Sequence, residues 1–372
     1  VRDKYMEHLV KIMKKYQAME NAVCADGRAR GMFQFYGANR TGREAGRIIQ
    51  LQNLPQNHLP DLASARELVR RGDYDTVRLL YDSVSGTLSE LIRTVLLPEE
   101  GHRFIVCDYS AIEARVIAYI AQEQWRLDVF RGGGDIYCMS ASQMFKVPVV
   151  KNGENGHLRQ KGKIAELACG YGGGINALKA FGADKMGMTE EEMVETVDLW
   201  RASSPRICAL WRSLESAAIR CIVRQSSAVS DIGGIRFDWE SGILWMTLPS
   251  GRRIAYWGAE DGERRYKNGK TISYMSLDQF TKKWARTETW GGKIAENLTQ
   301  ATARDCLRES MLALEAEGFD IRAHVHDEVI ITEPIGGRGL SEVAEIMGRE
   351  LAWAPGLPLR GDGYETEFYR KD

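Results

Sequence analysis

The stretch that decides the fold is residues 104–118, FIVCDYSAIEARVIA. Residues 104–107 are apolar and form a run of strand length, and Asp108 ends this run. From Ser110 the apolar residues recur with helical spacing, and Ser110 is expected to cap the helix. An unpaired carboxylate costs several kcal/mol to desolvate, so Asp108 needs a cation, a hydrogen-bond network or water beside it.

A second acidic site lies inside another apolar stretch, AHVHDEVII at 323–331. Its pattern predicts strands at 321–325 and 329–331, joined by a tight turn at His326-Asp327. One interpretation is that Asp108 and Asp327 converge on a divalent metal, because hard oxygen ligands suit Mg²⁺ and phosphoryl chemistry. The alternative is that each aspartate only belongs to a hairpin turn.

A third pattern lies on a helix predicted from Leu158 to Tyr171. Arg159, Lys163, Leu167 and Tyr171 are spaced by four residues and share one broad helix face. Two cations one turn apart can clamp a polyphosphate, and the glycines after this helix allow close approach of a ligand. The alternative is an exposed basic helix with a glycine C-cap.

The remaining pattern predicts a chain of helices interrupted by one β-rich patch. Helices are expected at 3–20, at 62–97 with breaks near Gly72 and Gly86, at 189–225 divided by Pro205, at 294–317 and at 340–351. The β-rich patch is expected at 232–257. Residues 262–271 end like a phosphate-binding loop but have the wrong glycine spacing, so a surface loop is predicted. The tryptophans at 200, 211 and 257 are expected to pack in the interior.

Composition indicates a globular protein without a membrane span. The chain has 372 residues, 50 Lys and Arg against 51 Asp and Glu, and no apolar run near membrane length. Seven cysteines show no metal-ligand spacing, which indicates reduced thiols in the cytoplasm and no structural zinc. Residues 1–60 carry a net charge of +5, which suits a polyanionic partner or a solvated surface.

Taken together, five motifs resemble the polymerase module of family A DNA polymerases, the DNA polymerase I class, and most of all its bacteriophage members. The motifs are TGR at 41–43, LQNLP at 51–55, CDYSAIEARVIA at 107–118, RQKGKIAELACGYGG at 159–173 and HVHDEVI at 324–330.

This resemblance implies an α+β fold: a right-hand polymerase with an antiparallel palm sheet and mainly helical fingers. The implied division is a palm at 1–122 and 285–372 and fingers at 123–284. The thumb is expected to be largely absent, with a candidate remnant helix at 3–20. Such a chain is expected to extend DNA distributively.

The resemblance also implies the catalytic groups. Asp108 and Asp327 match the two metal-binding aspartates, the backbone carbonyl of Tyr109 is a further ligand, and Glu328 is a nearby acid of lesser importance. The implied cofactor is Mg²⁺, two ions, with Mn²⁺ as a substitute. Lys163 matches the residue that protonates the leaving pyrophosphate.

The nucleotide and DNA contacts are implied in the same way. Glu113 matches the steric gate that excludes ribonucleotides, Leu167 stands where well-known members carry an aromatic residue, and Tyr137 stands where many carry histidine. The full nucleotide-binding set is Arg159, Lys163, Leu167, Tyr171, Gly172, Glu113 and Tyr137. The DNA-binding set is Arg43, Gln52, Asn53, Arg115, Gln300 and His326.

The implied activity is template-directed addition of deoxynucleotides to a primer 3′-hydroxyl, with release of pyrophosphate, in DNA replication. Its partners are primer-template DNA and deoxynucleoside triphosphates, with no membrane; thumb or exonuclease domains or accessory replication proteins complete the set. The expected location is the cytoplasm of a bacterial host cell, at its DNA. Two alternatives stay open: an enzyme like the single-subunit RNA polymerases, and a DNA-binding fragment that is inactive without its thumb.

Overall fold

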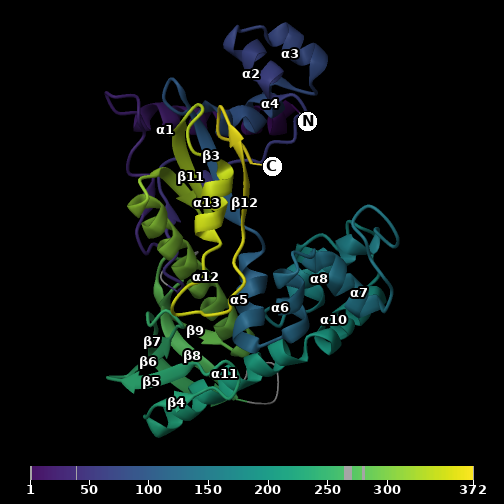
Figure 1. The fold of residues 1–372 in the computed structure, drawn as a ribbon, viewed down its shortest axis with the longest axis vertical. Helices are drawn as coiled ribbons and strands as arrows, with labels where there is room; N and C mark the ends of the chain where they lie inside the picture. The colour runs from purple at the N-terminus through teal and green to yellow at the C-terminus, as the bar shows by residue number, and fades with distance from the viewer. Residues whose placement is uncertain (1, 39, 264–269, 279–280, 372) are drawn as a thin grey trace. The chain divides into compact units, whose positions relative to one another are not determined.

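The chain divides into two compact units, which are described separately (Figure 1). The first contains residues 1–110, 307–348 and 360–372, and the second contains residues 111–306 and 349–359. This computed structural model describes all residues except 1, 39, 264–269, 279–280 and 372. The boundaries predicted at residues 122 and 284 concern the palm and the fingers and remain predictions.

The first unit is built on an antiparallel sheet of strand order β10-β11-β3-β12. Its strands are β3 (His102–Tyr109), β10 (Asp320–Val325), β11 (Glu328–Pro334) and β12 (Gly361–Thr366). The first three confirm the strands predicted around the two aspartates. Strand β12 was not predicted, because its residues have no apolar alternation and it is stabilised by pairing with β3.

The two faces of this sheet pack against different parts of the first unit. One face carries Phe104 and Val106, which pack with Ile330 and with Tyr369 of the C-terminal segment. The other face contacts α13 (Leu340–Met347). The contact with α13 is close, because a Cβ at Gly361 would lie 2.9 Å from the Cα of Ala344. A side chain at position 361 would therefore push the helix away from the sheet.

The other elements of the first unit come from the N-terminal part of the chain. They are α1 (Arg2–Ala22), β1 (Phe33–Gln34), β2 (Ala45–Gly46), the 3₁₀ turn η1 (Leu51–Asn53), α2 (Leu62–Arg70), α3 (Tyr74–Leu80), α4 (Val84–Leu91) and the 3₁₀ turn η2 (Ile92–Val95). Gly72 separates α2 from α3, as predicted. Gly86 does not break a helix, since it lies in the first turn of α4, where its N–H donates to the capping Ser83.

The helices of the second unit are α5 (Ile112–Ala121), α6 (Gln124–Arg131), α7 (Ile136–Phe145), α8 (Leu158–Cys169), α9 (Ile175–Ala180), α10 (Glu190–Ser203) and α11 (Pro205–Arg224). Helix α12 (Gly291–Ala316) begins in this unit and ends in the first. Pro205 begins α11, as predicted. Ser110 does not cap α5; the N-cap position is Ala111, and the N–H of Ser110 donates to the Arg360 carbonyl at 3.0 Å, within the first unit.

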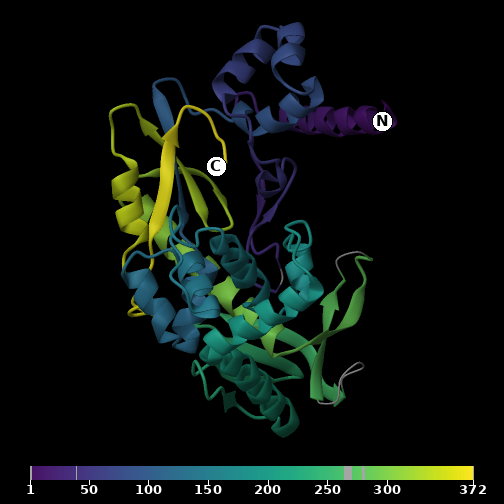
Figure 2. The ribbon, with the colours of Figure 1, turned by 90° about the vertical axis from the view of Figure 1, so that its right-hand side faces the viewer.

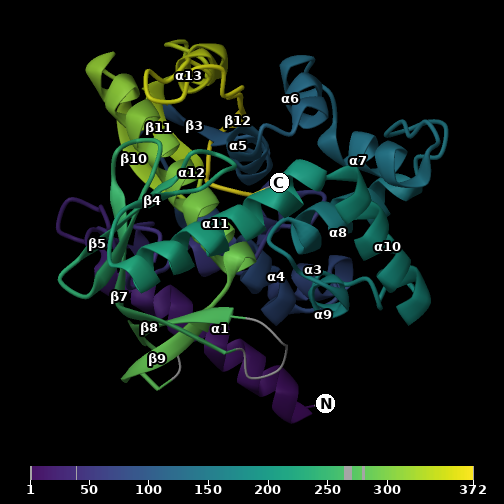
Figure 3. The ribbon, with the colours of Figure 1, turned by 90° about the horizontal axis from the view of Figure 1, so that it is seen from below.

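The second unit also contains an antiparallel sheet of strand order β4-β5-β6-β7-β8-β9. Its strands are β4 (Ala228–Val229), β5 (Arg236–Glu240), β6 (Ile243–Thr247), β7 (Arg253–Glu263), β8 (Lys270–Leu277) and β9 (Trp284–Thr289). Helix α11 packs along this sheet (Figure 3). The sheet extends well beyond the predicted patch at 232–257. The surface loop predicted within 262–271 falls largely on residues 264–269, which lie outside the described residues.

Two further expectations concern the membrane and the cysteines. Among the helices that the structure describes, none is long and apolar enough to cross a bilayer. All seven cysteines are free thiols; Cys24 is exposed and the other six are buried.

Candidate active site

The two aspartates singled out from the sequence meet at one end of the β3–β11 pair. Asp108 lies near the end of β3, and Asp327 lies in the turn between β10 and β11. The N–H of Tyr109 donates to the carbonyl oxygen of Asp327 at 3.1 Å. His326 adopts a left-handed conformation, φ 57°, which lets the turn close tightly. The backbone therefore places the two carboxyl-bearing residues side by side.

Both carboxyl groups have a raised pKa because they are buried near other acids. Burial, reinforced by the charge of Asp108, raises the pKa of Asp327 to about 6, although Lys371 and Arg43 oppose the shift. Burial also raises the pKa of Asp108, with Asp362 adding to the shift and Lys371 opposing it. Two partly desolvated carboxylates that repel each other form a site that a cation would stabilise.

Glu328 takes part in a different set of contacts. Its register partner is Asp108, but its carboxylate accepts a hydrogen bond from the Tyr369 hydroxyl at 2.8 Å and lies 3.8 Å from Nζ of Lys371. Arg93 donates in turn to the Tyr369 hydroxyl at 3.1 Å. Glu328 is only 3% exposed. These contacts direct its carboxylate into a buried polar network of the first unit.

The donor set fits Mg²⁺ held together with a phosphate-bearing substrate. Across the described residues, no group of three or more His, Cys, Asp and Glu side chains is close enough to hold a metal ion. Asp108, Asp327 and the carbonyl of Tyr109 supply hard oxygen donors, and Mg²⁺ usually takes only one or two carboxylates and completes its shell with water and phosphate. Sequence reasoning missed Asp362, which pairs with Asp108 across β12 and β3; the absence of a strand pattern around it hid this acid.

Three of the predicted DNA-binding residues line one small pocket in the first unit. These are Arg43, Gln52 and His326, and the ring of His324 stacks on Phe33 beside them with centroids 4.7 Å apart. Gln52 fits there because Gly46 has no side chain; a Cβ at Gly46 would overlap its amide. The remaining lining residues are Glu44, Gly46 and Val325. Asn53 does not line the pocket, and its amide donates to Gln50.

The cations of α8 gather around the start of α7 in the second unit. Nε of Arg159 donates to Asp135 at 2.8 Å, and Asp135 also caps α7 by accepting from the N–H groups of Tyr137 and Cys138. The guanidinium of Arg159 lies 5.3 Å from the Tyr137 ring centroid, and Nζ of Lys163 lies 6.0 Å from it. Three predicted nucleotide-binding residues are thus brought together. Asp135 was missed, although an aspartate before Ile-Tyr is an N-cap signature.

A buried ion pair anchors α8 to the helices around it. Glu166 of α8 forms a two-pronged pair with Arg126 of α6, with contacts of 2.5 and 2.8 Å, and accepts from the indole of Trp200 at 2.9 Å. Arg126 also donates to the hydroxyl of Ser204 at 2.8 Å. Trp200 is fully buried, as predicted, and stacks on Trp211. The anchor fixes the helix that carries Arg159 and Lys163.

Tyr171 and Glu113 contact each other directly. The hydroxyl of Tyr171 donates to Oε2 of Glu113 at 2.7 Å, across the segment after α8 and the first turn of α5. Gly172 has φ +80°, which favours glycine, and lies opposite Trp211 and Gly292. Leu167 is 43% exposed on α8.

Arg115 does not fit a role at a DNA surface. It is only 3% exposed, its guanidinium donates to the Pro358 carbonyl at 2.7 Å, and it lies 4.4 Å from the Phe130 ring centroid. Arginine placed in this way stabilises the packing of α5. The expectation that Arg115 contacts DNA is therefore corrected.

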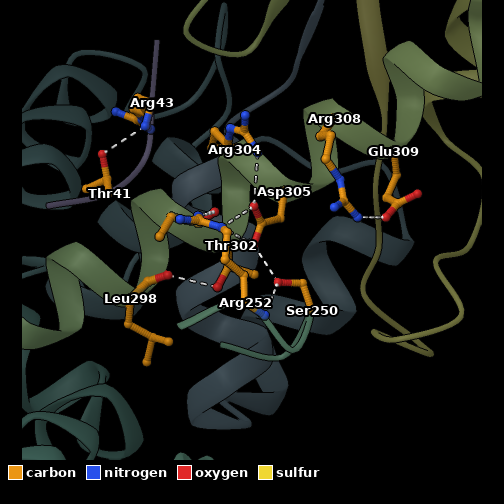
Figure 4. A network of polar contacts seen from close by, with 11 residues as sticks. Thr41, Arg43, Ser250, Arg252, Leu298, Thr302, Arg304, Asp305, Arg308 and Glu309 are labelled. Carbon is orange, nitrogen blue, oxygen red and sulfur yellow. Dashed lines mark hydrogen bonds and ion pairs between the residues drawn. The ribbon is translucent and has the colours of Figure 1, made fainter. Parts of the chain in front are cut away.

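Gln300 lies on α12, one turn away from a network that braces this helix (Figure 4). Asp305 is buried and accepts from Ser250 and, at 2.8 Å, from Nε of Arg252, while a second nitrogen of Arg252 donates to the Ala301 carbonyl at 3.0 Å. Arg304 lies 3.6 Å from the same carboxylate. The network ties the β6–β7 turn to α12 and so fixes the helix that presents Gln300.

These features are those of a right-hand polymerase domain, and comparisons with known proteins agree. Residues 3–226 match the family model of DNA polymerase family A. The DNA polymerase of Bacillus phage SP02 is 49% identical over 360 residues, which are 97% of this chain and 55% of that protein. The thermostable DNA polymerase I of Thermus thermophilus is 25% identical over 280 residues, 73% of this chain and 27% of that protein. The chain belongs to DNA polymerase family A.

A solved structure has the same fold. It is the POL domain of Pol1 from M. smegmatis in complex with DNA primer-template and dNTP, with a TM-score of 0.63 and 18% sequence identity. The match covers 96% of this chain and 51% of that one. The chain thus spans about half the length of this neighbour and of the phage relative.

Proposed function

We propose that this chain adds deoxynucleotides to the 3′-hydroxyl of a primer, directed by a template strand, with release of pyrophosphate. The observation that carries the proposal is the juxtaposition of Asp108 and Asp327 at the end of β3. Membership of DNA polymerase family A supports it. We propose DNA replication as the process and the cytoplasm of a bacterial host as the place, because the phage SP02 relative is a DNA polymerase.

Asp108, Asp327 and the carbonyl of Tyr109 would hold the divalent ions, Mg²⁺ or Mn²⁺ in its place. Bound there, two ions supply Lewis-acid activation of the primer hydroxyl and neutralise charge on the triphosphate and on the leaving pyrophosphate. Glu328 orients the strand through Tyr369 and Lys371. Its contacts give it a positioning role next to Asp108.

Arg159 and Lys163 would grip the incoming triphosphate. The Arg159 guanidinium binds two phosphate oxygens as a fork, and it exchanges its contact with Asp135 for the phosphate. Lys163 is a point charge at the same site and would deliver a proton to the leaving pyrophosphate. Tyr137 limits the space beside both cations.

Glu113 and Tyr171 would select the sugar and the base pair. Their hydrogen bond holds the Glu113 carboxylate in one place, where it would crowd the sugar C2′ and exclude a ribonucleotide. The Tyr171 ring, with Gly172 beside it, would pack against the template base or the new pair. Leu167 offers the nucleotide an aliphatic surface in place of an aromatic ring.

Arg43, Gln52 and His326 would contact the primer-template near the primer end, and Gln300 would contact its minor groove. Minor-groove acceptors occur on every base pair, so Arg and Gln can test pair geometry without reading sequence. We propose that β3 and β10–β12 belong to the palm and that α8 belongs to the fingers, with boundaries near residues 122 and 284. Further domains or accessory replication proteins would complete the set of partners.

The test is extension of a labelled primer-template with Mg²⁺ and either deoxy- or ribonucleotides. We expect extension with deoxynucleotides only, abolished in Asp327→Ala. Asp320→Ala is the matched control, because Asp320 is an exposed acid at the start of the neighbouring β10. Extension that survives Asp327→Ala would contradict the proposal, and so would binding of DNA without extension by the intact chain.

A further inference from the structure

One face of the sheet in the second unit is partly exposed to solvent. Side chains alternate across it: Leu244, Tyr256 and Tyr274 point to the buried face. The opposite face carries two adjoining rows that the strand register defines. The first row is Ile243, Trp257, Met275 and Arg286. The second row consists of the pair Trp245 and Ala255 and the pair Leu277 and Trp284. Together these rows are called the outer face.

The outer face exposes large aromatic side chains. Trp257 is 49% exposed and Trp284 is 56% exposed, although sequence patterns placed Trp257 in the interior. The β8–β9 hairpin that carries Trp284 lies at the right-hand edge of Figure 2, in green. Exposed apolar area of this kind, gathered on one sheet face, marks a binding surface.

Cations are interleaved with these tryptophans. The guanidinium of Arg253 lies 4.4 Å from the Trp245 ring centroid and pairs with Glu240, and Arg286 pairs with Glu260 at 3.0 Å. Both ion pairs are exposed, and exposed pairs contribute little to stability, so a phosphate can replace either glutamate at low cost.

A cleft of mixed charge adjoins the same strands, because Arg201 and Arg212 line it together with Glu215 and Glu288. It is lined by Thr271 of β8 and Glu288 of β9, by Arg201 and Arg212, and by Trp290, and it has a volume of about 900 Å³. Gly172, next to the proposed base-packing Tyr171, also lines it. The cleft thus connects the surroundings of Tyr171 with the strands of the outer face.

We propose that the outer face binds single-stranded DNA by stacking bases on Trp257 and Trp284, with Arg253 and Arg286 contacting phosphates. Exposed aromatic rings among cations are the usual means of binding single strands without sequence preference. A stable protein interface has a core depleted of charge, whereas here Arg286 stands within one row and Arg253 lies on the Trp245 ring. The outer face contains none of the residues proposed for catalysis, so DNA binding there is independent of the proposed reaction.

The first test measures the binding of a labelled oligothymidylate of about 20 nucleotides by fluorescence anisotropy. Excess unlabelled duplex primer-template is present, so that the proposed active site is already occupied. We expect the double variant Trp257→Ala/Trp284→Ala to lose about tenfold or more in affinity. Trp257→Phe/Trp284→Phe keeps the rings and should retain most of it. Tyr74→Ala is the matched control, because Tyr74 is an exposed aromatic residue on α3 of the first unit.

The second test locates the contact. Photocrosslinking with an oligonucleotide that carries 5-iododeoxyuridine should label Trp257 or Trp284 in the intact chain. Labelling elsewhere only, or an affinity within about twofold in the alanine variant, would overturn the proposal. Self-association that these substitutions abolish, measured by light scattering, would overturn it in favour of a contact between two copies.

The outcome is independent of the polymerase proposal. If the chain binds and crosslinks as expected but extends no primer, the outer face stands and the proposed reaction fails. If the chain extends primers, KM for the primer-template should be compared on templates with about 3 and about 20 unpaired nucleotides. The alanine variant should have a higher KM than the intact chain only on the longer template. If the alanine variant had the same KM as the intact chain on both templates, the outer face would not contact the template strand.

Discussion

The hydroxyl of Tyr171 donates a hydrogen bond of 2.7 Å to Oε2 of Glu113. This contact joins the segment after α8 to the first turn of α5. It therefore couples the residue proposed to pack on the base pair with the residue proposed to exclude the ribose 2′-hydroxyl.

We predict that Glu113→Ala lowers the discrimination between deoxy- and ribonucleotides by about tenfold or more, because it removes the side chain proposed to crowd the sugar. The measurement is the ratio of kcat/KM for the two nucleotides. Glu113→Gln keeps the volume and an acceptor for Tyr171 and should retain most of the discrimination. Equal ratios in the intact chain and in Glu113→Ala would contradict the proposed gate.

Stability should depend on the charge of Asp327. Its pKa is raised to about 6, above its unfolded value, so deprotonation destabilises the folded state progressively as the pH rises from about 4 to about 6. We predict that Asp327→Asn, without divalent ions, raises the free energy of unfolding by about 2 kcal/mol above pH 6 and by little near pH 4. Urea unfolding at both pH values measures this.

Mg²⁺ should produce the same stabilisation in the intact chain by binding to the native site. It should leave Asp327→Asn nearly unchanged, while Asp320→Asn, which alters an exposed acid, should respond like the intact chain. A midpoint of unfolding that does not respond to Mg²⁺ in the intact chain would argue against the metal site.

Arg159 and Lys161 of α8 should differ in their effect on KM for the incoming nucleotide. We predict that Arg159→Ala raises KM for the incoming nucleotide by about tenfold or more, because a fork to the triphosphate is lost. Lys161→Ala on the same helix, whose ammonium pairs with Glu192 at 3.3 Å, should change KM by less than about twofold. Steady-state kinetics on one primer-template compares the two; similar KM values would place the triphosphate elsewhere.

The buried pair of Arg126 and Glu166 should matter for folding. We predict that Glu166→Ala destabilises the chain by about 3 kcal/mol, because it leaves a buried guanidinium and the Trp200 indole without their acceptor. Glu67→Ala, which removes an exposed partner of Arg71, should cost less than about 1 kcal/mol. Denaturant unfolding distinguishes the two, and equal losses would show that the buried pair is not an anchor.

Leu167 should affect the choice between deoxy- and dideoxynucleotides. We predict that Leu167→Tyr increases dideoxynucleotide acceptance, because the exposed position accommodates a ring against the nucleotide. Leu167→Met keeps an aliphatic side chain and should leave acceptance unchanged. Termination bands in a primer-extension assay report the ratio; no change in Leu167→Tyr would move the nucleotide away from this face.

The elements around the aspartates could be predicted because their signals are local. Apolar runs of strand length end at Asp108 and flank Asp327, and helical spacing follows at once, so β3, α5, β10 and β11 were predicted within a few residues. The residue choices at Arg159 and Lys163 rested on spacing by four, and the structure places both at Tyr137. Their roles in the reaction remain proposals.

Other features could not be predicted because they depend on distant partners. Strand β12 is defined by its pairing with β3, and this pairing brings Asp362 opposite Asp108. The resemblance placed Arg115 among the DNA contacts, but the Pro358 carbonyl and the Phe130 ring enclose its side chain. Spacing alone cannot distinguish an arginine that faces solvent from one that faces a neighbouring segment.

Gly162 has a mechanical consequence for α7 and α8. A Cβ at this position would overlap the Tyr137 carbonyl oxygen, so the two helix backbones meet with no side chain between them. Such a junction resists sliding and rotation. Any movement of α8 should therefore carry Tyr137, Arg159 and Lys163 together, so that the side chains proposed to bind the triphosphate keep their mutual arrangement.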